Sequence, residues 1–253
     1  MIWLVVKYIL AAAARDKILI SFLLFMAVGI SLSVFLGSAA VTEKDQFSIV
    51  FAASALRLGS LFTLVLFTVF YIRKSFDTRD VEYMLTKPIN RLQFLTGNAL
   101  AFTLLSFIIA ALSSIIIFLM PISGDIEGTL TWSLSLFIEL VLMSNIALFF
   151  SFVLTSAVSA TLMSLAFYSL ARMIGGILGV IAAETQTGAM LLMEKIMLVI
   201  SIIIPRLDLM GQGSWLLYGV QDGVNWVFII TQGIVFLGFI FSATLIDFKR
   251  KQF

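Results

Sequence analysis

The sequence predicts an all-α, polytopic membrane protein with six transmembrane helices. Hydrophobic residues make up 61% of the chain and the mean hydropathy is +1.14, which excludes a water-soluble fold of ordinary composition. Apolar runs of roughly 20 residues or more recur, each long enough to cross a bilayer core. They lack the alternation of apolar and polar residues that barrel strands require. Because no linker or soluble segment separates them, we expect residues 1–253 to form one membrane domain.

Composition also excludes several classes of function. The chain contains no cysteine and no histidine, so we expect no disulfide and no transition-metal site. It contains no Gly-x-x-x-x-Gly-Lys-Ser/Thr sequence, so any ATP used would be bound by another polypeptide. The net charge of +2 divides into clusters that report topology, and it does not indicate a nucleic-acid partner. We expect the chain itself not to be an enzyme.

The N-terminal segment, residues 1–17, predicts an amphipathic helix in the membrane interface, because it mixes apolar residues with Lys7, Arg15 and Lys17. The following apolar run, residues 18–41, predicts the first span. A cleavable signal peptide is the alternative, since the Ser-Ala-Ala sequence at Ser38 is similar to a cleavage site. The run is too long for the apolar region of a signal peptide, so we expect an anchor that is retained.

Five more apolar runs predict the remaining spans: 49–72, 94–120, 131–154, 157–183 and 226–246. The loop around Asp125 and Glu127 contains no Lys or Arg, whereas residues 247–251 are basic. The positive-inside rule therefore places that loop outside and both termini in the cytoplasm. The apolar run in residues 184–225 is too short to span, so we expect extracytoplasmic interfacial or re-entrant helices there.

A charged insert, residues 73–91, separates the second and third spans, within a predicted cytoplasmic loop of residues 73–93. It predicts a short amphipathic helix at the membrane surface, with acids in the first turn, apolar residues at i, i+3 and i+4, and a cationic end before a proline. The residues concerned are Asp77, Asp80, Val81, Met84, Leu85, Lys87 and Pro88. Asn90 and Gln93 have the spacing of a capping box, which would start the third span.

Three ionisable residues lie inside predicted spans: Arg57, Glu139 and Arg172. Each lies about 8 to 12 residues from the predicted outer end of its span, or roughly 12 to 18 Å at the helical rise. We therefore expect all three at one depth. An unpaired charge there costs about 3 kcal/mol, which pairing Glu139 with Arg172 or Arg57 would reduce. A structural ion pair is the first interpretation; a polar lining for a substrate path and a proton relay are alternatives.

Gly175 and Gly179 have the small-x-x-x-small spacing that lets another helix approach closely. We expect helix packing at this pair, either within the chain or with a second subunit.

The sequence YMLTKPINR from Tyr83 to Arg91, followed by Phe94 and Gly97, resembles the type-2 ATP-binding-cassette (ABC) permeases, as does ARDKIL at residues 14–19. More narrowly, it is similar to the branch with a Leu-Leu-Ser-Lys-Pro-Ile-Ser-Arg signature between spans two and three. The specific part of the resemblance is confined to residues 14–97, and the rest is similarity in the number and order of spans.

The resemblance implies a permease in the bacterial inner membrane that pairs with a second permease copy on two cytoplasmic ABC ATPase subunits. The ATPases would bind ATP and Mg, and this chain would hold no cofactor. Accessory extracytoplasmic proteins and membrane lipid are further expected partners. The insert would be the coupling helix that contacts the ATPase, through Asp77, Asp80, Val81, Tyr83, Met84, Leu85, Lys87, Pro88 and Arg91. One departure is Ser75, where the family often has glutamate; Asp77 lies nearby.

A membrane scaffold and an intramembrane enzyme are the alternative functions. A membrane scaffold could use the same fold to anchor partner proteins. An intramembrane enzyme needs two facing catalytic groups at one depth, and Glu139 has few partners of that kind in this sequence.

Overall fold

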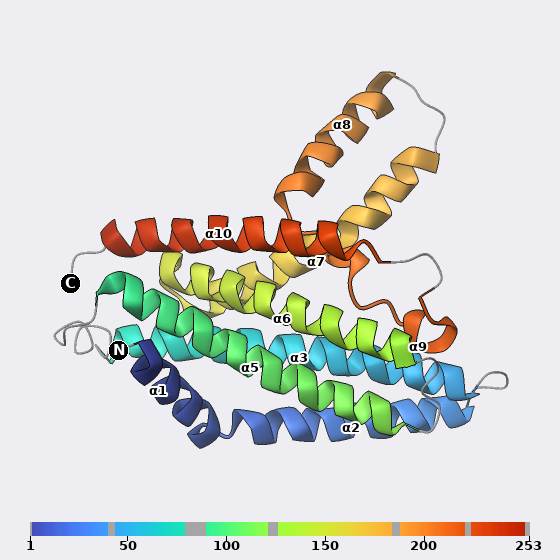
Figure 1. Ribbon diagram of the computed structural model, residues 1–253, viewed down its shortest axis with the longest axis horizontal. Helices are drawn as coiled ribbons and strands as arrows, with labels where there is room; N and C mark the ends of the chain where they lie inside the picture. The colour runs from blue at the N-terminus through green and yellow to red at the C-terminus, as the bar shows by residue number, and fades with distance from the viewer. Residues whose placement is uncertain are drawn as a thin grey trace.

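The computed structural model describes residues 2–39, 44–78, 90–120, 126–183, 188–220 and 224–250, and these residues form a helical bundle without strands (Figure 1). The all-α prediction is therefore confirmed. In chain order the elements are α1 (Ile2–Arg15), α2 (Ile18–Ala39), α3 (Lys44–Asp77), α5 (Arg91–Leu119), α6 (Ile126–Val153), α7 (Ala157–Ala183), α8 (Gly188–Ile203), the 3₁₀ helix η1 (Leu207–Leu209), α9 (Trp215–Tyr218) and α10 (Trp226–Arg250).

Six of these helices are long and apolar enough to cross a membrane: α2, α3, α5, α6, α7 and α10. They coincide with the six predicted spans, although α3 extends beyond the predicted range 49–72 at both ends. The polytopic arrangement is thus confirmed by length and composition.

Helices α3 and α6 form the centre of the bundle. In their most apolar windows 56% and 67% of the residues are buried, against 17% in α7. Helix α6 packs against α3, α5, α7 and α10, and its buried positions carry large apolar side chains such as Leu136, Leu140 and Phe152. These two helices are therefore the framework on which buried polar groups can be held in place.

Helix α1 packs across α5 through Val5, Val6 and Ile9, which are buried. A Cβ atom on Gly97 of α5 would lie 2.9 Å from Cβ of Val5, so glycine at this position allows the close crossing. The predicted N-terminal helix is confirmed. Lys17, with a φ of 56°, lies between α1 and α2.

One end of the bundle, which we call the basal end, contains the end of α3 at Asp77, the start of α5 at Arg91 and the end of α10 at Arg250 (Figure 1). Helix α1 lies near it. On the side of the bundle where α10 lies, α8 and the last turns of α7 project away from the remaining helices (Figure 1). Helices between the fifth and sixth spans were predicted, and α8, η1 and α9 confirm that they exist.

The prediction that Asp77 opens the surface helix is wrong, because Asp77 is the last residue of α3. Its carboxylate lies 3.7 Å from the guanidinium of Arg73 one turn earlier. Arg73 and Lys74 complement the partial negative charge at the helix C-terminus, which favours continuation of α3 past the apolar run. The other predicted coupling residues before Arg91 lie outside the described residues: Asp80, Val81, Tyr83, Met84, Leu85, Lys87 and Pro88.

The predicted start of the third span is confirmed. Asn90 precedes α5 with extended backbone angles, and its backbone N–H donates to Oε1 of Gln93 at 3.2 Å. This bond satisfies a backbone N–H at a helix start that would otherwise lack an acceptor within the helix.

Candidate functional site

The three predicted intramembrane charges meet in the centre of the bundle, each supplied by a different helix. Oε2 of Glu139 on α6 accepts hydrogen bonds from Nε and Nη2 of Arg57 on α3, at 2.8 and 2.6 Å. Nη1 of Arg172 on α7 lies 4.0 Å from Oε1 of the same carboxylate. The side chain of Glu139 is fully buried and that of Arg57 nearly so, whereas 31% of the Arg172 side chain is exposed. The predicted pairing is confirmed, with both arginines on one carboxylate.

A segment that sequence reasoning did not connect to these charges packs onto them. We call residues 205–213, between α8 and α9, the capping loop. Arg57 donates through Nη2 to the carbonyl oxygen of Met210 at 2.9 Å and through Nη1 to that of Gly211 at 2.5 Å. Arg172 donates through Nη1 to the carbonyl oxygens of Leu207 and Met210 at 2.6 and 2.9 Å. The two guanidinium groups therefore converge on Met210 and hold the loop.

Gly211 is the position in the capping loop where only glycine fits. Its φ is +57°, and a Cβ atom there would lie 2.6 Å from Cζ of Arg57. Its N–H donates to Oγ of Ser135 on α6 at 2.9 Å. The sequence signal is the pair Gly211 and Gly213 soon after Pro205, which marks a turn without showing what the turn contacts.

Contacts with α7 and α10 also hold the capping loop in place. Arg206 and Asp208 form an ion pair at 2.7 Å, and the Asp208 carboxylate lies directly against Gly175 of α7. Gln232 of α10 accepts from the N–H of Arg206 at 3.1 Å and donates to the carbonyl oxygen of Ser201 at 2.6 Å. Together these bonds tie α7, α8 and α10 to the loop.

The predicted glycine pair is used differently from a helix–helix contact within the described chain. Gly175 makes room for the capping loop, because a Cβ atom at this position would collide with Asp208. A Cβ atom on Gly179 or Gly176 would meet no atom within 4 Å in the part of the chain that the structure describes.

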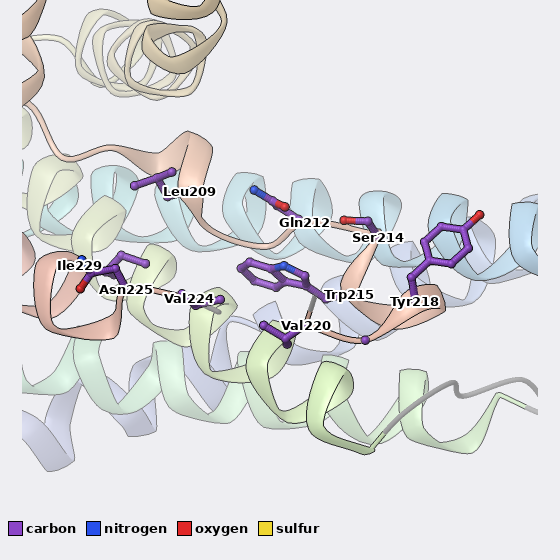
Figure 2. A pocket seen from close by; sticks show the side chains of 10 residues that line it. Leu209, Gln212, Ser214, Trp215, Tyr218, Val220, Val224, Asn225 and Ile229 are labelled. Carbon is purple, nitrogen blue, oxygen red and sulfur yellow. The ribbon is translucent and has the colours of Figure 1, made fainter. Parts of the chain in front are cut away.

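A cavity of about 360 Å³, which was not predicted, lies between the capping loop, α9 and the start of α10 (Figure 2). The indole of Trp215 stands between Gln212 and Ser214 on one side and the apolar Val220 and Val224 on the other in this view. The remaining lining residues are Leu209, Tyr218, Gly219, Asn225 and Ile229. The lining is mixed, with amide, hydroxyl and aromatic groups beside aliphatic ones.

At the basal end, two arginines bind the C-terminal carbonyls of neighbouring helices. Nη1 of Arg91 donates to the carbonyl oxygens of Phe248 and Lys249 at 2.8 and 2.9 Å, and its guanidinium lies 5.6 Å from the Phe248 ring centroid. Nη1 of Arg73 donates to the carbonyl oxygen of Leu154 at 3.1 Å, at the end of α6. The two helices that flank the charged insert are thereby fastened to α10 and α6.

Comparison with protein-family models and with curated proteins found no match to this chain.

Proposed function

We propose that this chain is the membrane-spanning permease subunit of an ABC transporter, driven by a separate cytoplasmic ATPase. The observation that carries the proposal is the construction of the basal end. The first residues of the charged insert form the end of α3 at Asp77 and its last residue begins α5 at Arg91, and the arginines at its two ends, Arg73 and Arg91, bind the ends of α6 and α10. A force applied to the insert would therefore reach four spans at once.

The basal end is the cytoplasmic end in this proposal. Among the described residues, the basic side chains of α1, the end of α3, the start of α5 and the end of α10 belong to it, with Lys17 just after α1: Lys7, Arg15, Lys17, Arg73, Lys74, Arg91, Lys249 and Arg250. The segments assigned to the outer face carry Lys44 at the start of α3, Lys195 in α8 and Arg206 in the capping loop. The positive-inside rule supports cytoplasmic termini, and the proposed membrane is a bacterial inner membrane.

Helix α3 connects the basal end to the buried charges. Arg73 and Arg57 lie on this helix 16 residues apart, or about 24 Å at 1.5 Å per residue. Closure of the ATPase pair would displace the insert, and α3 and α6 would transmit that displacement to the capping loop. The two-position element that such coupling requires is, in this proposal, the capping loop with its arginine contacts.

The proposed partners are two copies of the ATPase, which bind ATP and Mg, and a second copy of this chain. The exposed apolar surface of α8 supports the second copy, because Ile196, Val199 and Ile202 are each more than half exposed. This chain would catalyse no covalent step itself and would hold no cofactor. Membrane lipid, and accessory extracytoplasmic proteins, would be its other contacts.

The test is purification of the full chain from its native membranes in a mild detergent. A stoichiometric ATPase that hydrolyses MgATP in the complex is expected. Arg91→Gln should lower that hydrolysis, because it frees the start of α5 from α10, while Lys249→Gln removes a charge at the same end but keeps the carbonyl that Arg91 binds. A non-ATPase partner alone would favour a scaffold, and turnover of a substrate by the isolated chain would favour an intramembrane enzyme.

A further inference from the structure

We propose that Arg172 is the head-group site for an anionic amphiphile, whose alkyl chain lies along α7. The amphiphile is a molecule with one phosphate or carboxylate group and an aliphatic tail. This inference requires only that the chain is embedded in a membrane, so it stands or falls separately from the ATPase partner.

The balance of charge around the capping loop favours an anion beside Arg172. The cluster around the capping loop contains the arginines Arg57, Arg172 and Arg206 and the carboxylates Glu139 and Asp208. Arg57 forms an ion pair with Glu139 at an N–O distance of 2.6 Å, and Arg206 forms one with Asp208 at 2.7 Å. Arg172 is left 4.0 Å from a carboxylate that is already paired, so the cluster carries one positive charge in excess. Inside a membrane an uncompensated charge is costly, and an anion beside it would remove that cost.

The hydrogen bonds of Arg172 also favour an anion beside it. A guanidinium carries five N–H donors. Arg172 uses Nη1 for the carbonyl oxygens of Leu207 and Met210. Within the described ranges, no acceptor lies within hydrogen-bond distance of its Nε or Nη2. These atoms form the edge of the fork that binds a carboxylate or phosphate through two parallel bonds.

The surface beside Arg172 has a matching shape. A groove of about 470 Å³ begins at Arg172 and continues along α7, lined by Met173, Gly176, Ile177, Val180 and Ile181. Among the described residues every lining residue except the arginine is apolar, and the absence of a side chain at Gly176 leaves the middle of the groove open. From Arg172 to Ile181 the helix rises about 13 Å, which gives an alkyl chain a continuous apolar wall. One cation at the end of an apolar groove matches the chemistry of an anionic amphiphile.

The experiment uses the full chain in nanodiscs of phosphatidylcholine, which is neutral overall. Two photoreactive probes of equal chain length, a fatty acid and the matching fatty alcohol, are compared, and a photoreactive phosphatidic acid forms a third arm. Labelling of α7 by the acid is expected to exceed labelling by the alcohol about tenfold, since hydrogen bonds to charged groups are stronger than neutral ones. The ratio of fatty acid to phosphatidic acid labelling distinguishes a carboxylate head from a phosphate head.

Three variants make the test specific. Arg172→Gln should remove the preference for the acid, and Lys195→Gln, which removes an exposed cation from α8, should leave it unchanged. Gly176→Leu should reduce labelling by both probes, because it fills the groove and leaves the arginine in place. If Arg172→Gln is unstable, Arg172→Lys, which keeps the charge, should retain the preference in part.

Equal labelling by acid and alcohol, or an unchanged preference in Arg172→Gln, would overturn the proposal. So would coverage of the groove by a second copy. Because the chain has no cysteine, Gly176→Cys provides a single thiol for that measurement. Complete disulfide cross-linking between two copies, unaffected by added fatty acid, would show that protein and not an amphiphile occupies the groove.

Discussion

Replacement of Glu139 by glutamine would test whether the buried charges hold the bundle and its capping loop together. Glutamine keeps the shape and one acceptor oxygen but removes the charge that both arginines face. Arg57 is only 5% exposed, so its guanidinium would stay buried without a counter-charge. Removal of one partner of a buried ion pair costs about 3 to 5 kcal/mol, and the remaining amide oxygen places Glu139→Gln near 3 kcal/mol. For a chain of this length that is a fall in Tm of roughly 6 to 12 °C.

The assay is thermal unfolding of the purified chain in detergent, followed by tryptophan fluorescence. Ser144→Ala is the matched control: Ser144 is also buried on α6, but its hydroxyl bonds only the carbonyl oxygen of Val141, at 3.0 Å, within its own helix. Its loss should cost about 1 kcal/mol or less. The double variant Arg57→Gln/Glu139→Gln should lose less stability than the two single variants added together, because the pair is coupled. A Tm for Glu139→Gln within about 2 °C of the parent would refute the reasoning.

Three further variants test single contacts by the same assay. Gly211→Ala should lower the free energy of unfolding by at least about 1 to 3 kcal/mol, because the added methyl group meets the Arg57 guanidinium at a positive φ. Its control is Gly179→Ala, in open space on α7, which should be neutral or slightly stabilising. An equal loss of stability in both variants would contradict the role of the loop. Gln232→Leu should raise the rate of amide hydrogen exchange at residues 201–206 and leave the rate in α5 unchanged, because the Gln232 amide is hydrogen-bonded to the Ser201 carbonyl oxygen and to the Arg206 N–H. An unaltered rate at residues 201–206 would show that the amide does not hold this segment. Gly97→Val should make α1 accessible to protease without unfolding the spans, because the valine would occupy the space of Val5; a protected α1 would argue against the close crossing.

Some features of this protein could be predicted from local sequence because they depend on one segment at a time. A long apolar run forms a helix in a membrane, since each unpaired backbone group in hydrocarbon costs several kcal/mol. This is why all six spans were predicted within a few residues. The start of α5 was also predictable, because the bond between Asn90 and Gln93 joins positions three apart.

The meeting of Arg57, Glu139 and Arg172 lies between the two cases. The cost of an unpaired charge in hydrocarbon predicted that they pair, and counting residues from the outer ends of their spans predicted that they share a depth. It did not predict which arginine donates hydrogen bonds to the carboxylate of Glu139. Packing of α3 against α6 decided that, by placing Arg57 within direct reach and Arg172 at 4.0 Å.

The end of α3 was mispredicted for a related reason. The apolar run stops at Ile72, but helix formation does not require apolar residues once Arg73 and Lys74 complement the C-terminus. Asp77 therefore belongs to the span helix, and the preference of acidic residues for a first helical turn assigned it to the wrong element.

Hydrophobicity, charge distribution and helix-start chemistry are properties of short stretches, and the order of the residues alone determined them: six spans, three charges at one depth and the cap of α5. The capping loop, the use of Gly175 and Gly211 to admit it, and the bonds of Arg172 to Leu207 and Met210 required the tertiary structure. Each joins residues far apart in the chain, such as Arg57 with Gly211. A residue's own neighbours in sequence carry no information about which distant backbone carbonyl will reach it, because that depends on how the helices pack.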